Sequence, residues 1–212
     1  MGDSAAAFFR KHLGIENIRV LYAGRPRDPH PCLTPSVTED KQTKHSQKIR
    51  FMDAAPISLT TSASLKDIHA RFPSGAALNT DDGEFSETKF RSNIHVAVSD
   101  DTPAYSEEFW RKIIIGEQQQ QGGGVKLQCT YNTPRCLSIN VDYATGKQAP
   151  TDKQIYKLMM KDRRINPEFN FKPCFGRYCF CDDFGATVRV GDKVRVLETN
   201  PERHAPGMDT LC

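Results

Sequence analysis

The sequence predicts a mainly β fold with helical decoration, arranged as a barrel or a sandwich. Short apolar, β-branched runs separated by polar turns recur through the 212 residues, and few segments have the spacing of an amphipathic helix. The chain is 38% hydrophobic and 26% charged, which is the balance of a globular protein with one main core. We therefore expect one main domain built largely from short strands.

Charge and cysteine content narrow the function classes. The formal net charge is +3, too small for nucleic acid to be expected as a partner. No apolar run approaches the ~20 residues of a membrane-spanning helix, so we expect no membrane segment in this chain and a cytoplasmic location, with mitochondrial association only through a segment outside this sequence. Seven irregularly spaced cysteines without a secretory signal favour reduced thiols.

The first third of the chain alternates predicted helices, strands and loops. Ser4 is placed to cap a helix that runs through Leu13 and ends at Gly14, and "NIRVLYAG" follows as a strand. Residues 25–48 hold four prolines and almost no large apolar side chains, which predicts a long loop.

Two strands and a helix are predicted next. "APISLTT" has the apolar, β-branched composition of a strand, and Ser62 is placed to cap a helix with Leu65, Ile68 and Phe72 on one face. "KFRSNIHVAV" alternates as a half-buried strand does.

The second half of the chain is predicted as further strands with short helical pieces. Ser106 caps a helical turn anchored by Trp110, and Ile113 to Ile115 lead into a strand. The predicted elements that follow are strands in "VKLQC" and "CLSINVD", a helix from Thr151 with a Thr151/Gln154 capping box, and a hairpin in "ATVRVGDKVRVLE".

Several sequence pieces, weak individually, occur in one order that resembles the MOSC domain, found in molybdenum-cofactor sulfurases and in the amidoxime-reducing component. That family has F-R-x-N-I on a strand, a Trp-containing segment ending in I-G, an R-C pair followed by V-D-x-x-T-G, then F-G-x-Y and a V-G-D-x-V hairpin. The matching residues are Phe90, Arg91, Asn93 and Ile94; Glu107 to Gly116 with Trp110; Arg135, Cys136, Val141, Asp142, Thr145 and Gly146; Phe175, Gly176 and Tyr178; and Val190, Gly191, Asp192 and Val194.

The resemblance implies a domain arrangement. A MOSC-type β-barrel is expected over residues 49–198, preceded in 1–48 by a remnant of a β-rich N-terminal subdomain and a proline-rich loop, and followed in 199–212 by a flexible tail. The helix-then-strand entry "AAAFFRKHLGIENIRVLY" and "DAAPISLTTSASLKDI" are closer to the amidoxime-reducing branch. That branch implies the molybdenum cofactor, in the form of molybdenum bound to molybdopterin, as the ligand.

The resemblance also assigns residue roles. It makes Cys136 the metal ligand and the catalytic thiol, since soft thiolate donors suit such a metal. Arg135 beside it would favour the thiolate and hold an anionic cofactor, with Pro134 stiffening the loop. Arg91 and Asn93, two apart on a predicted strand, would share a face and bind the phosphate and pterin edges. The remaining predicted cofactor-binding residues are Tyr178, Asp53, Ala55 and Pro56.

Each assignment has a plain structural alternative. A cysteine at a strand start is usually a small buried hydrophobe, Arg91 could pair with Asp142 or Glu107, Tyr178 could be a core aromatic, and "DAAP" could be only a turn. "CFGRYCFC" is dense in thiols, but its spacing lacks the paired C-x-x-C of zinc sites. The better expectation for Cys174, Cys179 and Cys181 is buried reduced thiols.

Three functions remain open on this basis. The first is a module of a molybdenum oxidoreductase that receives electrons from a haem protein and its reductase and reduces an N-hydroxylated small molecule. The second is a non-catalytic cofactor-binding or sulfur-carrier domain related to molybdenum-cofactor sulfurase, whose pyridoxal-phosphate domain has no counterpart in this sequence. The third is an interaction domain that has lost the cofactor. The branch resemblance favours the first.

Overall fold

The computed structural model describes residues 3–20, 55–71, 87–116, 123–143, 145–166, 171–181 and 186–203. Its α-helices are α1 (Asp3–Leu13), α2 (Ser62–Ala70) and α3 (Ile155–Met159). Its strands are β1 (Ile57–Thr61), β2 (Ile94–Val96), β3 (Trp110–Ile115), β4 (Val125–Pro134), β5 (Cys174–Cys181) and β6 (Val194–Thr199). Its short 3₁₀ helices are η1 (Glu87–Phe90), η2 (Ser106–Phe109), η3 (Leu137–Asn140) and η4 (Thr151–Lys153).

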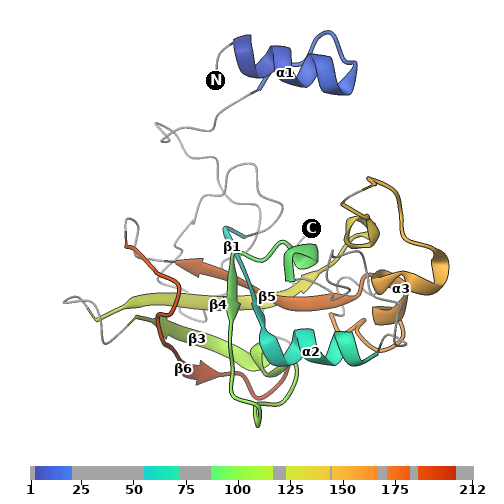
Figure 1. The fold of residues 1–212 in the computed structure, drawn as a ribbon. Coiled ribbons are helices and arrows are strands. Elements are labelled where there is room, and N and C mark those ends of the chain that lie inside the picture. The colour runs from blue at the N-terminus through green and yellow to red at the C-terminus, as the bar shows by residue number, and fades with distance from the viewer. Residues whose placement is uncertain are drawn as a thin grey trace.

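All six strands form one sheet in the order β2-β1-β5-β4-β3-β6. The β1–β2 pair is parallel, and the other four pairs are antiparallel. The sheet curls into a half-barrel: in Figure 1, β3, β4 and β5 lie across the molecule while β1 and β2 cross them steeply. This arrangement confirms the predicted mainly β fold with helical decoration.

Two clusters of buried apolar side chains stabilise the half-barrel. The first, here called the barrel-side core, is formed by side chains of the sheet strands: Leu59, Val96, Trp110, Ile113, Ile115, Val125, Leu127, Cys129 and Cys179. The second, here called the helix-side cluster, packs the helices against the loops and consists of Ile68, Phe90, Tyr105, Ile139, Ala149, Ile155, Met159 and Phe175. Because Phe90 and Ile139 belong to this second cluster, the segments that carry Arg91 and Cys136 are anchored against the same core.

The N-terminal helices lie close to where the sequence predicts them, but their first turns differ: α1 begins at Asp3, so Ser4 lies inside the helix and does not cap it. Helix α1 ends at Leu13, and Gly14 follows with φ +66°, as expected for a left-handed residue after a helix. Helix α2 begins at Ser62, but its N-cap is Thr61, whose Oγ1 accepts a hydrogen bond from the Ser64 amide. Residues 17–20 of the predicted strand "NIRVLYAG" are not in a strand.

The predicted strand "KFRSNIHVAV" is much shorter than expected. Residues 87–90 form a 3₁₀ helix, Arg91 has φ 50°, and the strand covers Ile94–Val96. The cause is packing: the Phe90 ring stacks on Phe175 with centroids 3.7 Å apart and is fully buried, so the chain must turn sharply to seat it.

The predicted strand "CLSINVD" is instead the 3₁₀ helix η3. Tertiary contacts override its β-branched composition: Ile139 is buried in the helix-side cluster, and the Asn140 side chain accepts a hydrogen bond from the Tyr156 amide. Cys136 therefore follows the end of β4 rather than opening a strand.

Three smaller predictions also differ from the structure. Ser106 opens η2 but does not cap it, since the N-cap is Tyr105 and no side chain caps the turn. The Thr151/Gln154 capping box is replaced by η4 followed by α3, with the side-chain amide of Gln154 donating to the Ala149 carbonyl. The predicted hairpin at Gly191 has one strand, β6, which pairs with β3 instead.

Some predictions fall on residues outside the described ranges. These include Asp53, Phe72, most of the "EQQQQGGG" stretch, and the whole proline-rich segment 25–48. Within the described residues, no helix combines the length and the apolar character needed to cross a membrane.

Candidate functional site

Cys136 presents an exposed thiol between β4 and η3. Its Sγ lies 2.9 Å from the hydroxyl oxygen of Ser138 and 4.0 Å from Nη2 of Arg91. The thiol is therefore not the small buried hydrophobe of the plain alternative. It stands at the surface with a hydroxyl and a guanidinium beside it.

These neighbours favour the ionised thiol. Partial burial raises the pKa of Cys136, but hydrogen bonds from the Ser138 side chain and backbone amide, together with the positive charge of Arg91, outweigh it, so the pKa is lowered below its usual value. A thiolate is the form of cysteine that attacks electrophiles and binds metals. The site is thus chemically prepared for either role.

Arg91 reaches this thiol from a turn, not from a strand. Its backbone has φ 50°, an uncommon conformation for a residue with a side chain, and the buried ring of Phe90 fixes the turn on its N-terminal side. Arg91 and Cys136 come into contact, but Arg91 lies outside β2, so the predicted strand alternation with Asn93 is wrong. The alternative partner Glu107 is fully buried and accepts hydrogen bonds from Thr61 and Ser64.

Asn93 has a structural use in this arrangement. Its side-chain oxygen accepts a hydrogen bond from the Ser58 backbone amide at 2.8 Å, and its backbone amide donates to the Ser58 carbonyl at 2.8 Å. These two bonds join the start of β2 to β1. The amide oxygen of Asn93 is therefore already engaged by the protein.

Arg135 turns away from the thiol beside it in the sequence. Its guanidinium is buried and donates to the carbonyl oxygens of Phe175 and Phe90 and to the Ser58 hydroxyl. Burial lowers its pKa to about 10. Arg135 thus holds β5, η1 and β1 together. Its charge still attracts that of the Cys136 thiolate, but the guanidinium within 4.0 Å of the sulfur is that of Arg91.

The other predicted residues lie on neighbouring strands. Pro134 is the last residue of β4, opposite Cys174 on β5. Tyr178 lies on β5, opposite Ser58 of β1, with its ring packed edge-on to Tyr131 at 5.1 Å between centroids. Ala55 is buried and Pro56 is partly buried just before β1. Of the residues predicted for the site, Arg91 contacts the Cys136 sulfur.

Two residues near the thiol were not predicted. Ser138 follows Cys136 by two positions, and a Cys-x-Ser spacing at the end of a strand was the available signal. Tyr156 comes from α3, and the pKa of its phenol is raised by burial and by the negative charge of the Cys136 thiolate. Its hydroxyl donates to the Phe171 carbonyl at 3.2 Å. No local sequence pattern links Tyr156 to Cys136.

The remaining thiols of β5 are largely internal. Cys174 and Cys179 are buried and Cys181 is partly exposed. Cys179 faces Cys129 across the β4–β5 pair, with the two sulfurs 3.4 Å apart. In the part of the chain that the structure describes, no group of three or more His, Cys, Asp or Glu residues is placed to hold a metal ion.

The thiolate can be tested without any cofactor. We expect Cys136 to react with iodoacetamide at a lower pH than an ordinary thiol, because its pKa is lowered. Ser138→Ala should shift the rate profile to higher pH and slow the reaction several-fold at neutral pH. The measurement is site-resolved alkylation followed by mass spectrometry. If the pH profile of Ser138→Ala were unchanged, the Ser138 hydroxyl would not contribute to the lowered pKa of Cys136.

Comparison with known proteins decides the family. Residues 46–195 match the MOSC domain, which is more than half of the chain. The chain belongs to the MOSC domain family. The match also contains every described residue of the thiol site: Arg91, Cys136, Ser138 and Tyr156.

Curated proteins similar to this chain include mitochondrial amidoxime-reducing components. The chain is 26% identical over 200 residues to "Mitochondrial amidoxime-reducing component 1" of Mus musculus, covering 92% of this chain and 51% of that protein. Identity is 29% over 181 residues to the component 1 of Danio rerio, covering 83% and 49%. It is 27% over 202 residues to "Mitochondrial amidoxime reducing component 2" of Homo sapiens, covering 91% and 51%. The chain spans about half the length of these relatives.

Proposed function

We propose that this MOSC domain binds the molybdenum cofactor through Cys136 and forms the cofactor-holding part of a reductase. The observation that carries the proposal is the exposed, thiolate-favouring Cys136 with the Arg91 guanidinium 4.0 Å from its sulfur. The MOSC family is associated with this cofactor. A single accessible thiolate flanked by a cation is the donor that such a cofactor requires from the protein.

The residues present fit this group in part. Cys136 offers a soft thiolate, and Arg91, exposed beside it, offers a guanidinium fork suited to a phosphate. When bound, the cofactor would supply oxygen-transfer and electron-transfer chemistry. Arg91 would orient its anionic part, and Ser138 would keep the sulfur ionised. Arg135 would act indirectly, because its guanidinium holds the carbonyl of Phe90, the residue before Arg91.

The substrate class follows from the relatives, whose names describe reduction of amidoximes. We propose an N-hydroxylated small molecule as substrate, with electrons supplied by a haem protein and its reductase. The N-hydroxyl oxygen would leave as water after accepting two electrons and two protons. Tyr156, whose pKa is raised by burial and by the Cys136 thiolate and whose hydroxyl donates to the Phe171 carbonyl, would border the substrate on the α3 side.

Reductase activity tests this function. Cys136→Ala, produced in a host that makes the cofactor and supplied with a reduced viologen dye, should lose more than about a hundredfold of its benzamidoxime reduction, as expected when a ligand of the reacting metal is lost. Cys181→Ala is the matched control, since Cys181 lies on β5 and is partly exposed, and should keep its rate. Wild-type turnover in Cys136→Ala would refute the proposal. A persulfide found on Cys136 without any reductase activity would favour the sulfur-carrier function.

A further inference from the structure

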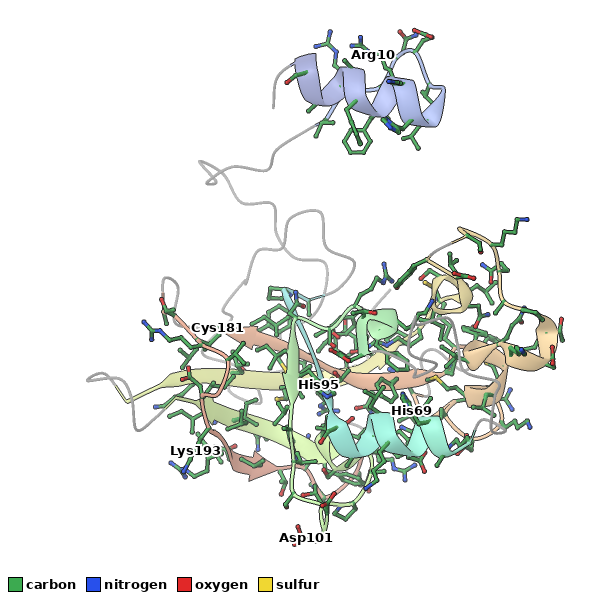
Figure 2. The ribbon with its side chains drawn as sticks, viewed as in Figure 1. Arg10, His69, His95, Asp101, Cys181 and Lys193 are labelled. Atoms are coloured by element: carbon green, nitrogen blue, oxygen red, sulfur yellow. The ribbon has the colours of Figure 1, made fainter. Side chains whose placement is uncertain are left out.

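A large apolar groove lies at the open seam of the half-barrel. Strands β2 and β6 are the two outer strands of the sheet, and a cavity of about 960 Å³ lies between β2 and residues 188–196. Figure 2 marks its two walls, with His95 on β2 and Lys193 just before β6. The apolar side chains that line it include Val96, Val98, Trp110, Ile115, Val194 and Val196.

The groove opens directly onto the barrel-side core. Val96, Trp110 and Ile115 line the groove and also belong to the buried cluster between the strands. At the mouth, Val190 is fully exposed and Val188 is 44% exposed. Its volume lies within the range of ~300–1,000 Å³ for small-molecule sites, which are also mostly apolar. The groove therefore has the size and lining of a ligand site.

The charges at the mouth are mainly positive. Arg189 and Lys193 flank a tight turn in which the Asp192 amide donates to the Arg189 carbonyl at 3.1 Å and Gly191 has φ +95°. The one carboxylate of this wall, Asp192, accepts a hydrogen bond from the Arg189 amide at 2.8 Å. The rim of the groove therefore carries two cations and one carboxylate, and that carboxylate already accepts a hydrogen bond.

We propose that this groove binds the anion of a single-chain fatty acid. The alkyl chain would lie over Val98, Val194 and Val196, which keep exposed apolar surface above the buried Val96, Trp110 and Ile115, and would thereby remove apolar surface from water. The carboxylate would remain at the rim beside Arg189 and Lys193. The other polar lining groups are Asn93, His95, Ser99, Thr102 and Ser106. Burial lowers the pKa of His95, so none of them adds a second cation at neutral pH. This inference is independent of the thiol site and of the proposed reductase function.

Trp110 makes the test direct, because it is the single tryptophan of the chain and lines the groove. Titration with bromododecanoate should quench its fluorescence saturably. Unlabelled alkanoates should displace the probe about fourfold more tightly for each added methylene. Dodecyltrimethylammonium, with the same chain and the opposite charge, should compete at least tenfold more weakly.

Charge variants locate the head group. The double variant Arg189→Glu, Lys193→Glu should weaken the competition of dodecanoate at least tenfold, since it reverses both rim cations. The matched control, Lys157→Glu on α3 with Lys161→Glu just after it, reverses two exposed cations outside the groove and should leave the competition unchanged. Absence of saturable quenching, equal competition by the cationic amphiphile, or displacement of the probe only by anionic phospholipid vesicles or by an extended valine-rich peptide would overturn the proposal.

Discussion

Replacing Arg135 by methionine should destabilise the fold by about 2–5 kcal/mol, because the buried carbonyls of Phe175 and Phe90 would lose their donor. Methionine keeps much of the side-chain volume, so the loss reports the hydrogen bonds rather than a cavity. Chemical denaturation of the cofactor-free protein measures it. The effect should be present without any ligand.

Arg91→Met is the matched control for this prediction. Its guanidinium is exposed and lies at the thiol, so the substitution should change stability by less than about 0.5 kcal/mol while weakening retention of an anionic cofactor. If Arg135→Met were as stable as the wild type and lost only cofactor, then Arg135 would be a binding residue, as the sequence first predicted.

Gly176→Ala should be at least as damaging, at about 3 kcal/mol or more. A Cβ built on Gly176 would lie 2.4 Å from the Leu59 carbonyl oxygen and 2.8 Å from the Thr60 side chain, and the residue has φ +77°. Strain at positive φ adds to this backbone clash, which β1 cannot relieve without losing its pairing with β5. Thermal unfolding measures the loss.

Gly146→Ala separates the two contributions. Gly146 has a similar φ of +69° but nothing within 4 Å of a built Cβ, so only the conformational strain of about 1 kcal/mol should remain. Equal destabilisation by both substitutions would mean that the contact between β5 and β1 at Gly176 is not tight. The F-G-x-Y motif would then need another explanation for its glycine.

The fold could be predicted where local pattern and packing agree. The α1 helix, with Gly14 after its last residue, and strand β1 followed by α2 appear close to where the sequence placed them. Prediction failed where one buried side chain decided the backbone. Phe90 ends a predicted strand by stacking on Phe175, and Ile139 turns another into η3. Such long-range packing leaves no periodic signal in a short segment.

The candidate site was predictable through motif order and not through geometry. The order identified Cys136 and Arg91, which the structure brings together. It could not show that Arg135, next to the thiol in sequence, turns inward, because neighbouring residues at a strand end have no fixed relative direction. Ser138 reaches the thiol through the turn of η3, and the packing of α3 brings the Tyr156 phenol near enough for its pKa to respond to the thiolate. Both depend on tertiary structure.

Metal and pterin analysis of the protein tests the central claim most directly. Wild type and Cys136→Ala would be purified from a host that makes the molybdenum cofactor, then assayed for molybdenum by mass spectrometry and for pterin by fluorescence after oxidation. We predict molybdenum and pterin in equal amounts in the wild type, and loss of most molybdenum in Cys136→Ala with an unchanged unfolding temperature. Wild-type protein without either component, or Cys136→Ala with wild-type metal content, would contradict the assignment of Cys136 as the ligand.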